Sequence, residues 1–221
     1  MMALPKIADY PLPQSEDLPQ ARAPFQLDTD RAALLVHDMQ RYFCAAYGAD
    51  ALTREGALLR KVALNIAEIA KQARALGVPV FYTAQKGNQL PADRGLQKDL
   101  WGPGMQAIPE HEEIIAPLRP EAGDIQLVKH RYSAFQRSNL QDLMRARGRD
   151  QLMVTGIYAH IGCLATSSEA FQRDIEPFFI ADAVADFSVE KHQMALDWVA
   201  ACSGAVISTG AALGAFEGTQ S

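Results

Sequence analysis

Cysteine, clustered basic residues and long apolar runs are all scarce in this chain of 221 residues. Its three cysteines, Cys44, Cys163 and Cys202, form neither a disulfide framework nor a CxxC metal motif, so a reducing cytoplasm is the expected location. The net charge is −5 and no Lys/Arg cluster is present to neutralise phosphates, which argues against nucleic acid as a partner. No run reaches the roughly 18 apolar residues of a membrane span, so no membrane partner is expected either.

The apolar content of 48% excludes a mainly disordered chain and predicts a folded protein. Because the charge argues against nucleic acid and anionic membranes, a small molecule is the expected partner. We expect a single domain over residues 1–221. Its first 27 residues are rich in proline and weakly periodic, which predicts an extended arm lying over the body of the domain.

Beyond residue 27, short apolar runs alternate with segments of helical periodicity. The run at residues 32–37 (AALLVH) has the length and composition of a strand buried on both faces. The expected strands are residues 32–37, 78–83, 125–130, 151–155, 178–181 and 205–208. The expected helices are residues 58–76, 110–118, 140–146, 163–174 and 189–201. This alternation predicts a three-layer α/β/α fold with a mainly parallel, roughly six-stranded sheet.

Residues 84–106 contain four glycines and two prolines without periodicity, and this length predicts a functional loop. Its Gly102-Pro103-Gly104 segment matches a dinucleotide-binding fingerprint only superficially, because no strand precedes it. The chain also lacks a GxxxxGK[ST] phosphate loop, a GxSxG elbow and an HExxH zinc helix.

Ligands of parallel α/β sheets bind beyond the carboxyl ends of the strands, so the residues there are the first functional candidates. Asp38 ends a buried strand, which suits either a functional acid or an N-cap for the next helix, and position alone does not separate the two. Lys129 would lie beside Asp38 if their strands were neighbours. Cys163, with His160 as a base, could be a nucleophile, although buried cysteines are mostly inert.

Three of these strand ends resemble the active-site blocks of the isochorismatase-like hydrolases. The matching segments are LLVHDMQ at 34–40, KHRYSAF at 129–135 and GIYAHIGC at 156–163. Further similarity in the arm, in YTAQ at 82–85, in WGPG at 101–104 and in DAVADFS at 182–188 extends the resemblance over almost the whole chain. Several blocks in the same order are more specific than any one motif.

The family has two broad chemistries, and the resemblance separates them. Its amidohydrolases carry a nucleophilic cysteine at the position that Gly162 holds here, whereas Cys163 lies one residue later. One residue at a helix start rotates a side chain by about 100°, so Cys163 should point away from the pocket. The metal ligands of nicotinamidases are missing from Thr83-Ala84-Gln85-Lys86. Neither covalent amide hydrolysis nor a metal is therefore expected.

The other chemistry is hydrolysis of a vinyl ether without a nucleophile or a cofactor. By this resemblance Asp38 is the general acid that protonates the enol-ether carbon, and its pKa should be raised by desolvation in the pocket and by the substrate's own carboxylates. Lys129 favours the ionised acid, and is therefore expected to orient Asp38 and bind a substrate carboxylate. The dianionic substrate needs hydrogen-bond donors, and the matching positions are Gln85, Arg94, Tyr132, Tyr158 and the backbone N–H of Gly162. Phe43 and Trp101 are expected to form apolar walls for its ring.

Two substrates fit this branch: isochorismate, the leading expectation, and the 2-amino-2-deoxyisochorismate of phenazine synthesis. An amidohydrolase using Cys163 and a non-catalytic binding protein are the remaining alternatives. The resemblance also implies a homodimer, and residues after Ser208 leave no room for an aryl carrier domain. His130 departs from the family pattern, which has tryptophan there.

Overall fold

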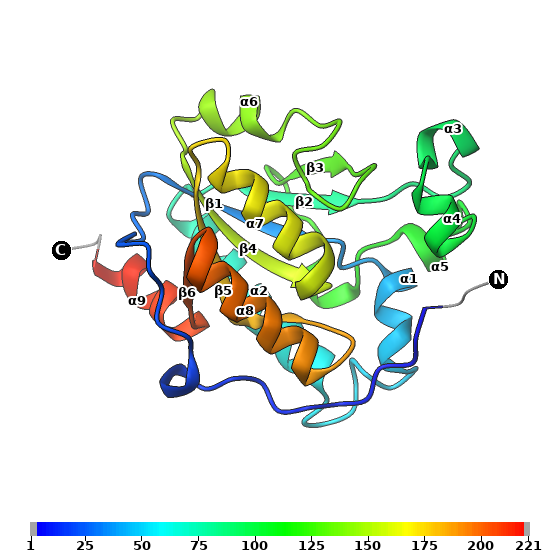
Figure 1. Cartoon of the computed structure of the whole chain (residues 1–221), viewed down its shortest axis with the longest axis horizontal. Helices are drawn as coiled ribbons and strands as arrows, with labels where there is room; N and C mark the ends of the chain where they lie inside the picture. The colour runs from blue at the N-terminus through cyan, green and yellow to red at the C-terminus, as the bar shows by residue number, and fades with distance from the viewer. Residues whose placement is uncertain (1–3, 219–221) are drawn as a thin grey trace.

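Six parallel strands form a single sheet through the middle of the molecule (Figure 1). The structure, a computed structural model, describes residues 4–218. The strands are β1 (Ala32–His37), β2 (Val80–Ala84), β3 (Ile125–Val128), β4 (Gln151–Ile157), β5 (Glu176–Ala185) and β6 (Ala205–Ile207). Their order across the sheet is β3-β2-β1-β4-β5-β6, and every neighbouring pair is parallel. The predicted fold class is confirmed.

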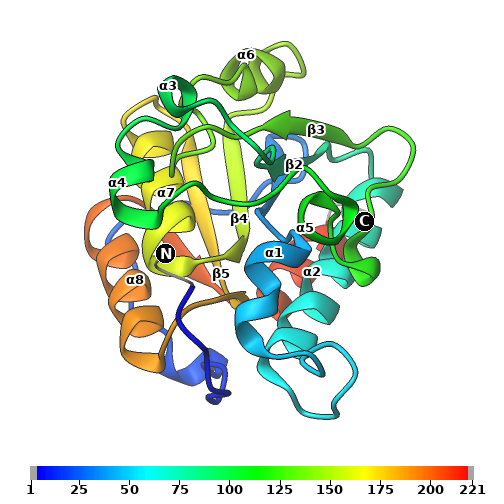
Figure 2. The same ribbon diagram turned by 90° about the vertical axis from the view of Figure 1, so that its right-hand side faces the viewer.

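Helices cover both faces of this sheet, as Figure 2 shows edge-on. They are α1 (Arg41–Cys44), α2 (Leu58–Ala75), α3 (Pro91–Arg94), α4 (Gln97–Trp101), α5 (Pro109–Glu112), α6 (Leu140–Arg145), α7 (Leu164–Phe171), α8 (Val189–Cys202) and α9 (Thr209–Gly218). Helices α2 and α9 pack on one face, and α7 and α8 pack on the other. No helix among residues 4–218 has the length and apolar character needed to cross a membrane.

Strand β1 lies in the middle of the sheet, between β2 and β4, and all six of its residues are buried. Leu34 and Val36 join the core on the α2 side, whereas Ala33 and Leu35 join the core beneath α7 and α8. Side chains alternate between the faces of a strand, so a continuous apolar run is what a strand covered on both faces requires.

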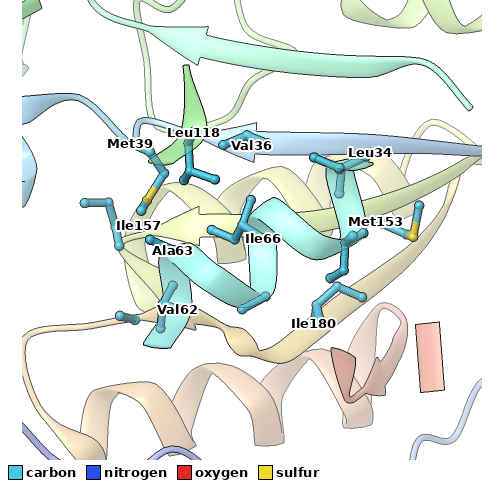
Figure 3. Close-up of a cluster of buried hydrophobic side chains, with 14 of the residues drawn as sticks. Leu34, Val36, Met39, Val62, Ala63, Ile66, Leu118, Met153, Ile157 and Ile180 are labelled. Carbon is cyan, nitrogen blue, oxygen red and sulfur yellow. The ribbon is translucent and has the colours of Figure 1, made fainter. Parts of the chain in front are cut away.

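Helix α2 buries one stripe of apolar side chains against the sheet (Figure 3). Val62, Ile66 and Ile69 are spaced by three and four residues and are fully buried against Leu34 and Val36. Each such aliphatic side chain contributes about 1.5–3 kcal/mol of burial free energy. This stripe is the reason the helical periodicity was readable in the sequence.

The arm predicted at residues 1–27 is extended over its described part, apart from a 3-10 turn at Ser15–Asp17. Its first three residues lie outside the described residues. Ile7 is buried and its N–H donates to the Ala46 carbonyl. The Tyr10 hydroxyl accepts from the Asp186 N–H at 2.7 Å and lies 3.1 Å from Nδ1 of His192. These contacts attach the arm to the domain.

Several element boundaries differ from the predictions. Residues 84–106 contain α3 and α4, residues 110–118 divide into α5 and a 3-10 turn (Ala116–Leu118), and a π-helical turn (Ala159–Cys163) precedes α7. Strand β5 begins earlier and runs through Asp182, whose charge interrupted the apolar pattern. That carboxylate accepts from the N–H and hydroxyl of Thr209 and so caps α9, a helix that its glycines conceal in the sequence.

Candidate active site

The parallel register brings the carboxyl ends of β1, β2, β3 and β4 to one edge of the sheet. His37 pairs with both Thr83 and Gly156, and Ala84 pairs with Val128. A cavity of about 640 Å³, counting the part open to solvent, lies at this edge. All nine residues predicted for the site line it: Asp38, Phe43, Gln85, Arg94, Trp101, Lys129, Tyr132, Tyr158 and Gly162.

Asp38 is held at the centre of the site by two side chains. Thr83 Oγ1 donates to Asp38 Oδ1 at 2.7 Å, and Lys129 Nζ donates to Asp38 Oδ2 at 2.8 Å. The carboxylate is 7% exposed and Lys129 is 2% exposed. The alternative that Asp38 caps the next helix is wrong, because α1 begins at Arg41 and its N-terminal flanking residue is Gln40.

Lys129 reaches Asp38 although their strands are not neighbours. Strand β2 lies between β1 and β3, so the condition under which the sequence placed Lys129 beside Asp38 is not met. The pair forms because Lys129 follows β3 immediately, is anchored by its N–H to the Ala84 carbonyl, and has a side chain long enough to pass the end of β2. Its ammonium also donates to the carbonyls of Arg131 at 2.7 Å and Tyr132 at 3.4 Å.

These contacts use the three N–H groups of the Lys129 ammonium. A substrate carboxylate could therefore receive a direct hydrogen bond from Lys129 only by replacing the long contact to Tyr132. The expected role of orienting Asp38 agrees with this geometry. Lys129 can bind a substrate carboxylate only through its charge, or by giving up its contact to the Tyr132 carbonyl.

The pKa of Asp38 lies below its usual value in this site. Burial acts to raise it, but the charge of Lys129 and the hydrogen bonds from Lys129 and Thr83 favour the carboxylate and together outweigh burial. The expectation that desolvation in the pocket leaves the pKa of Asp38 raised is therefore wrong, whereas the rise expected from the substrate's carboxylates stays a prediction. Any rise has to come with the negative charge of the ligand.

Arg94 is a buried cation facing the same cavity. It is 6% exposed, its Nε donates to the Gly102 carbonyl at 2.5 Å, and its guanidinium lies against Gly104. Within residues 4–218 no acidic side chain lies within ion-pair distance of Arg94, and burial lowers its pKa. A buried guanidinium without a counter-ion is costly, and an anion in the cavity would offset that cost.

The two tyrosines of the site differ in what their hydroxyls can do. The Tyr132 hydroxyl accepts from Trp101 Nε1 at 2.7 Å and keeps its own proton for a ligand. The Tyr158 hydroxyl instead donates to the carbonyl of Phe43 at 2.7 Å. The prediction that Tyr158 donates to the substrate is wrong in this geometry, because its proton is already used; its ring forms a wall of the cavity.

Gln85 presents its side chain to the cavity because a buried neighbour holds its backbone. Gln40 Oε1 accepts from the Gln85 N–H at 2.7 Å, and Gln40 Nε2 donates to the Gln85 carbonyl at 2.8 Å. Gln40 is fully buried and was not predicted as a site residue. Its place two residues after Asp38, at the end of the LLVHDMQ block, was the available signal.

Cys163 lies outside the cavity. Its side chain is fully buried and its Sγ points to the Thr155 carbonyl at 3.9 Å. Burial raises the pKa of this thiol well above its usual value, which keeps it protonated and unreactive. His160 pairs with Asp186, at 2.6 Å, and not with Cys163.

Sequence reasoning missed several residues of the site. Thr83 and His37 stand at the searched strand ends, but nothing in the sequence showed that their side chains meet Asp38 or Gly162. The other missed lining residues come from scattered segments and are Leu4, Tyr42, Gln97, Ile157, Ile161 and Phe187. His130, the departure from the family pattern, lines a separate surface groove beside Val128.

The chain is similar to known proteins over most of its length. The family model described as the isochorismatase domain matches residues 32–211. The chain is 52% identical over 199 residues to an isochorismatase of Bacillus subtilis, covering 90% of this chain and 62% of that protein. It is 46% identical over 208 residues to enterobactin synthase component B of Escherichia coli, covering 94% of this chain and 71% of that protein.

Two further matches extend the comparison. The phenazine biosynthesis protein PhzD of Pseudomonas fluorescens is 47% identical over 209 residues, which cover 95% of this chain and 98% of that protein. A solved structure of a cysteine hydrolase from Pseudomonas syringae superposes with a TM-score of 0.78 at 25% identity, covering 90% of this chain and 98% of that one.

Proposed function

Because the chain belongs to the isochorismatase family, we propose that it hydrolyses the vinyl ether of isochorismate to 2,3-dihydro-2,3-dihydroxybenzoate and pyruvate. The observation that carries this proposal is that one cavity holds a buried acid, Asp38, and a buried guanidinium, Arg94, which has no acidic partner among residues 4–218. A dianionic substrate supplies the missing counter-charge. Asp38 supplies the proton that the vinyl ether needs.

The charges of the cavity explain how Asp38 becomes an acid. Among the described lining residues, Arg94 and Lys129 are positive and Asp38 is negative, so these side chains together carry one net positive charge. A dianion reverses that excess, and uptake of one proton by Asp38 then makes the buried site neutral. Since unbalanced buried charge is costly, we infer that substrate binding raises the pKa of Asp38.

The protonated Asp38 then transfers its proton to the methylene carbon of the enol ether. A C–H bond forms as the C=C π bond is lost, and positive charge appears on the ether carbon as an oxocarbenium ion. Water adds to that carbon and returns a proton to the Asp38 carboxylate. The resulting hemiketal collapses with proton transfer to the leaving oxygen, which releases pyruvate and the ring diol. One water is consumed and Asp38 is regenerated.

The side chains around Asp38 have separate parts in this scheme. Lys129 and Thr83 fix the direction of the carboxyl group. Arg94, Gln85 and the free proton of Tyr132 are placed to bind the substrate carboxylates, while Phe43, Trp101 and Tyr158 bound the space for its ring.

A second candidate function is hydrolysis of 2-amino-2-deoxyisochorismate, which the sequence resemblance implied. The 47% identity to a phenazine biosynthesis protein over almost its full length favours it. The same residues perform the same chemistry, because the two substrates differ only at ring carbon 2.

The direct test measures pyruvate release, coupled to lactate dehydrogenase, with each substrate in turn. We expect turnover of at least one, and the larger kcat/KM identifies the preferred substrate. Asp38→Asn keeps the shape of the side chain without an acidic proton and should lower kcat by about 10²–10⁴-fold. Release of no pyruvate from either compound, or near-normal turnover by Asp38→Asn, would refute the proposal.

A further inference from the structure

The imidazole ring of His37 packs directly on the backbone of Gly162, in the space that a side chain at position 162 would occupy. A Cβ atom added at Gly162 would lie 2.1 Å from His37 Cε1 and 2.7 Å from His37 Nε2. Unbonded carbon atoms pack at about 3.5–4.0 Å, so no side chain at position 162 can coexist with this ring position. The space above Gly162 is occupied by the imidazole.

The imidazole cannot move aside without breaking other contacts. His37 is 1% exposed, its Nδ1 lies 2.9 Å from the Ile157 carbonyl oxygen, and its Nε2 lies 3.2 Å from the Tyr132 carbonyl oxygen. Those carbonyls belong to the end of β4 and to the loop after β3. A neutral imidazole has one N–H, and the shorter contact assigns it to Nδ1, which donates to the Ile157 carbonyl at the end of β4. The ring therefore joins the end of β4, which precedes Tyr158, to the end of β1.

Asp38, the residue after His37, has an unusual backbone. Its φ of +50° lies in the left-handed region, which costs a non-glycine residue about 1–2 kcal/mol. Such conformations persist where the surroundings impose them, and they cluster at active sites. With the His37 ring seated on Gly162, the chain leaves β1 in one direction, and Asp38 Oδ2 lies 3.9 Å from His37 Nδ1.

We propose that His37 is a positioning residue for the general acid: its ring, seated on Gly162 and held by a hydrogen bond from Nδ1–H to the Ile157 carbonyl, fixes the backbone that aims Asp38 into the cavity. His37 itself transfers no proton in this scheme. The assignment of a general acid rests on the proposed function, whereas the fit of the ring against Gly162 does not.

A double-mutant cycle tests that fit without any substrate. Gly162→Ala should lower the urea midpoint of unfolding clearly in the native background, because the added methyl meets the ring. In the His37→Ala background the same change should have little effect, since the space is then free. An equal loss in both backgrounds would overturn the pairing. Where His37→Ala does not fold, His37→Val provides the background.

Kinetics test the positioning role with whichever substrate releases pyruvate. His37→Ala and Gly162→Ala should each lower kcat by about 100-fold, the scale expected for a displacement of about 1 Å, with KM changed much less. His37→Asn can still place a nitrogen near the Ile157 carbonyl and should retain more of kcat than His37→Ala. A native kcat in His37→Ala, or a loss confined to KM, would overturn the role. A native protein that releases no pyruvate would instead refute the proposed function and leave the unfolding cycle to decide the pairing.

Discussion

Lys129 Nζ lies 2.8 Å from Asp38 Oδ2, and this ion pair joins the ends of β3 and β1 across the end of the strand between them. It is buried on both sides, so neither charge is screened by water. The pair therefore decides which protonation state Asp38 has before substrate arrives.

Thr83→Val should destabilise the protein at neutral pH by about 1.5–3 kcal/mol, the usual value of a hydrogen bond to a charged group. Thr83 stabilises the ionised form, so it contributes to the depressed pKa of Asp38. That contribution is complete above the pKa of an unfolded Asp, about 3.9, and is lost as pH falls through the lower pKa of the folded state. Urea unfolding of both proteins at several pH values measures the difference. Thr83→Ser, which keeps the hydroxyl, is the control, and a pH-independent loss would contradict the prediction.

Arg94→Gln should weaken substrate binding without destabilising the fold. The native guanidinium is buried without an acidic partner in the described part of the chain, so its removal relieves a desolvation cost. Loss of a charge-assisted bond to a carboxylate should raise KM by about 10–100-fold. Steady-state kinetics and urea unfolding check the two halves. Arg94→Lys retains the charge and should lie between the native protein and Arg94→Gln; an unchanged KM would show that Arg94 holds no carboxylate.

Binding of a dianion should be accompanied by uptake of about one proton at neutral pH, because Asp38 becomes protonated as the cavity receives negative charge. A saturated analogue with a lactyl ether in place of the enolpyruvyl ether binds without reacting and is the suitable ligand. Calorimetry in buffers of different ionisation enthalpy gives the number of protons. Asp38→Asn should take up none, and an equal uptake in that variant would place the proton elsewhere.

Stability should fall as pH decreases from 7.5 to 5.5, before most carboxylates titrate. Burial lowers the pKa of His37 and of His192, so these rings stay neutral in the fold but bind protons near pH 6.5 when unfolded. The unfolded state then holds more protons, and the slope that each histidine contributes grows as pH falls, to about 0.7 kcal/mol per pH unit at about pH 6.5 and towards about 1.4 below it.

His192→Gln separates one of these contributions. Nε2 of His192 lies 2.9 Å from the Ala181 carbonyl, while Nδ1 faces the Tyr10 hydroxyl, an arrangement that suits a neutral ring. In this variant unfolding should take up about one proton fewer below about pH 6.5, so the slope of unfolding free energy against pH should become smaller there. A slope equal to that of the native protein would assign the effect to other groups. Exposed Cys202→Ser is a matched surface control on the same helix.

The homodimer and the cytoplasmic location stay predictions, as does a reaction that needs no metal or cofactor. Sedimentation of the purified chain tests the first. Turnover after dialysis against a chelator tests the last, and lost activity restored by a divalent ion would contradict it.

The sequence by itself determined the class of the fold and the edge at which the site lies. Residues 32–36 of β1 are apolar because both faces of the strand are covered, and Asp38 follows soon after that apolar run ends. Helix α2 repeats apolar residues every three or four positions because one stripe is buried. These are local patterns, so composition and spacing reveal them. The blocks at residues 34–40, 129–135 and 156–163, which resemble the isochorismatase-like hydrolases in the same order, then identified the family, and the match over residues 32–211 confirmed it.

Only the tertiary structure decided which groups meet. Lys129 passes the end of β2 to reach Asp38, and the Tyr158 hydroxyl donates to the Phe43 carbonyl. The His37 ring packs on Gly162, more than a hundred residues away in sequence. Strand order, register and hydrogen-bond partners depend on packing between distant segments, and residue spacing carries no information about them. The pKa of Asp38 depends on those same contacts, which is why its direction could not be read from the residues alone.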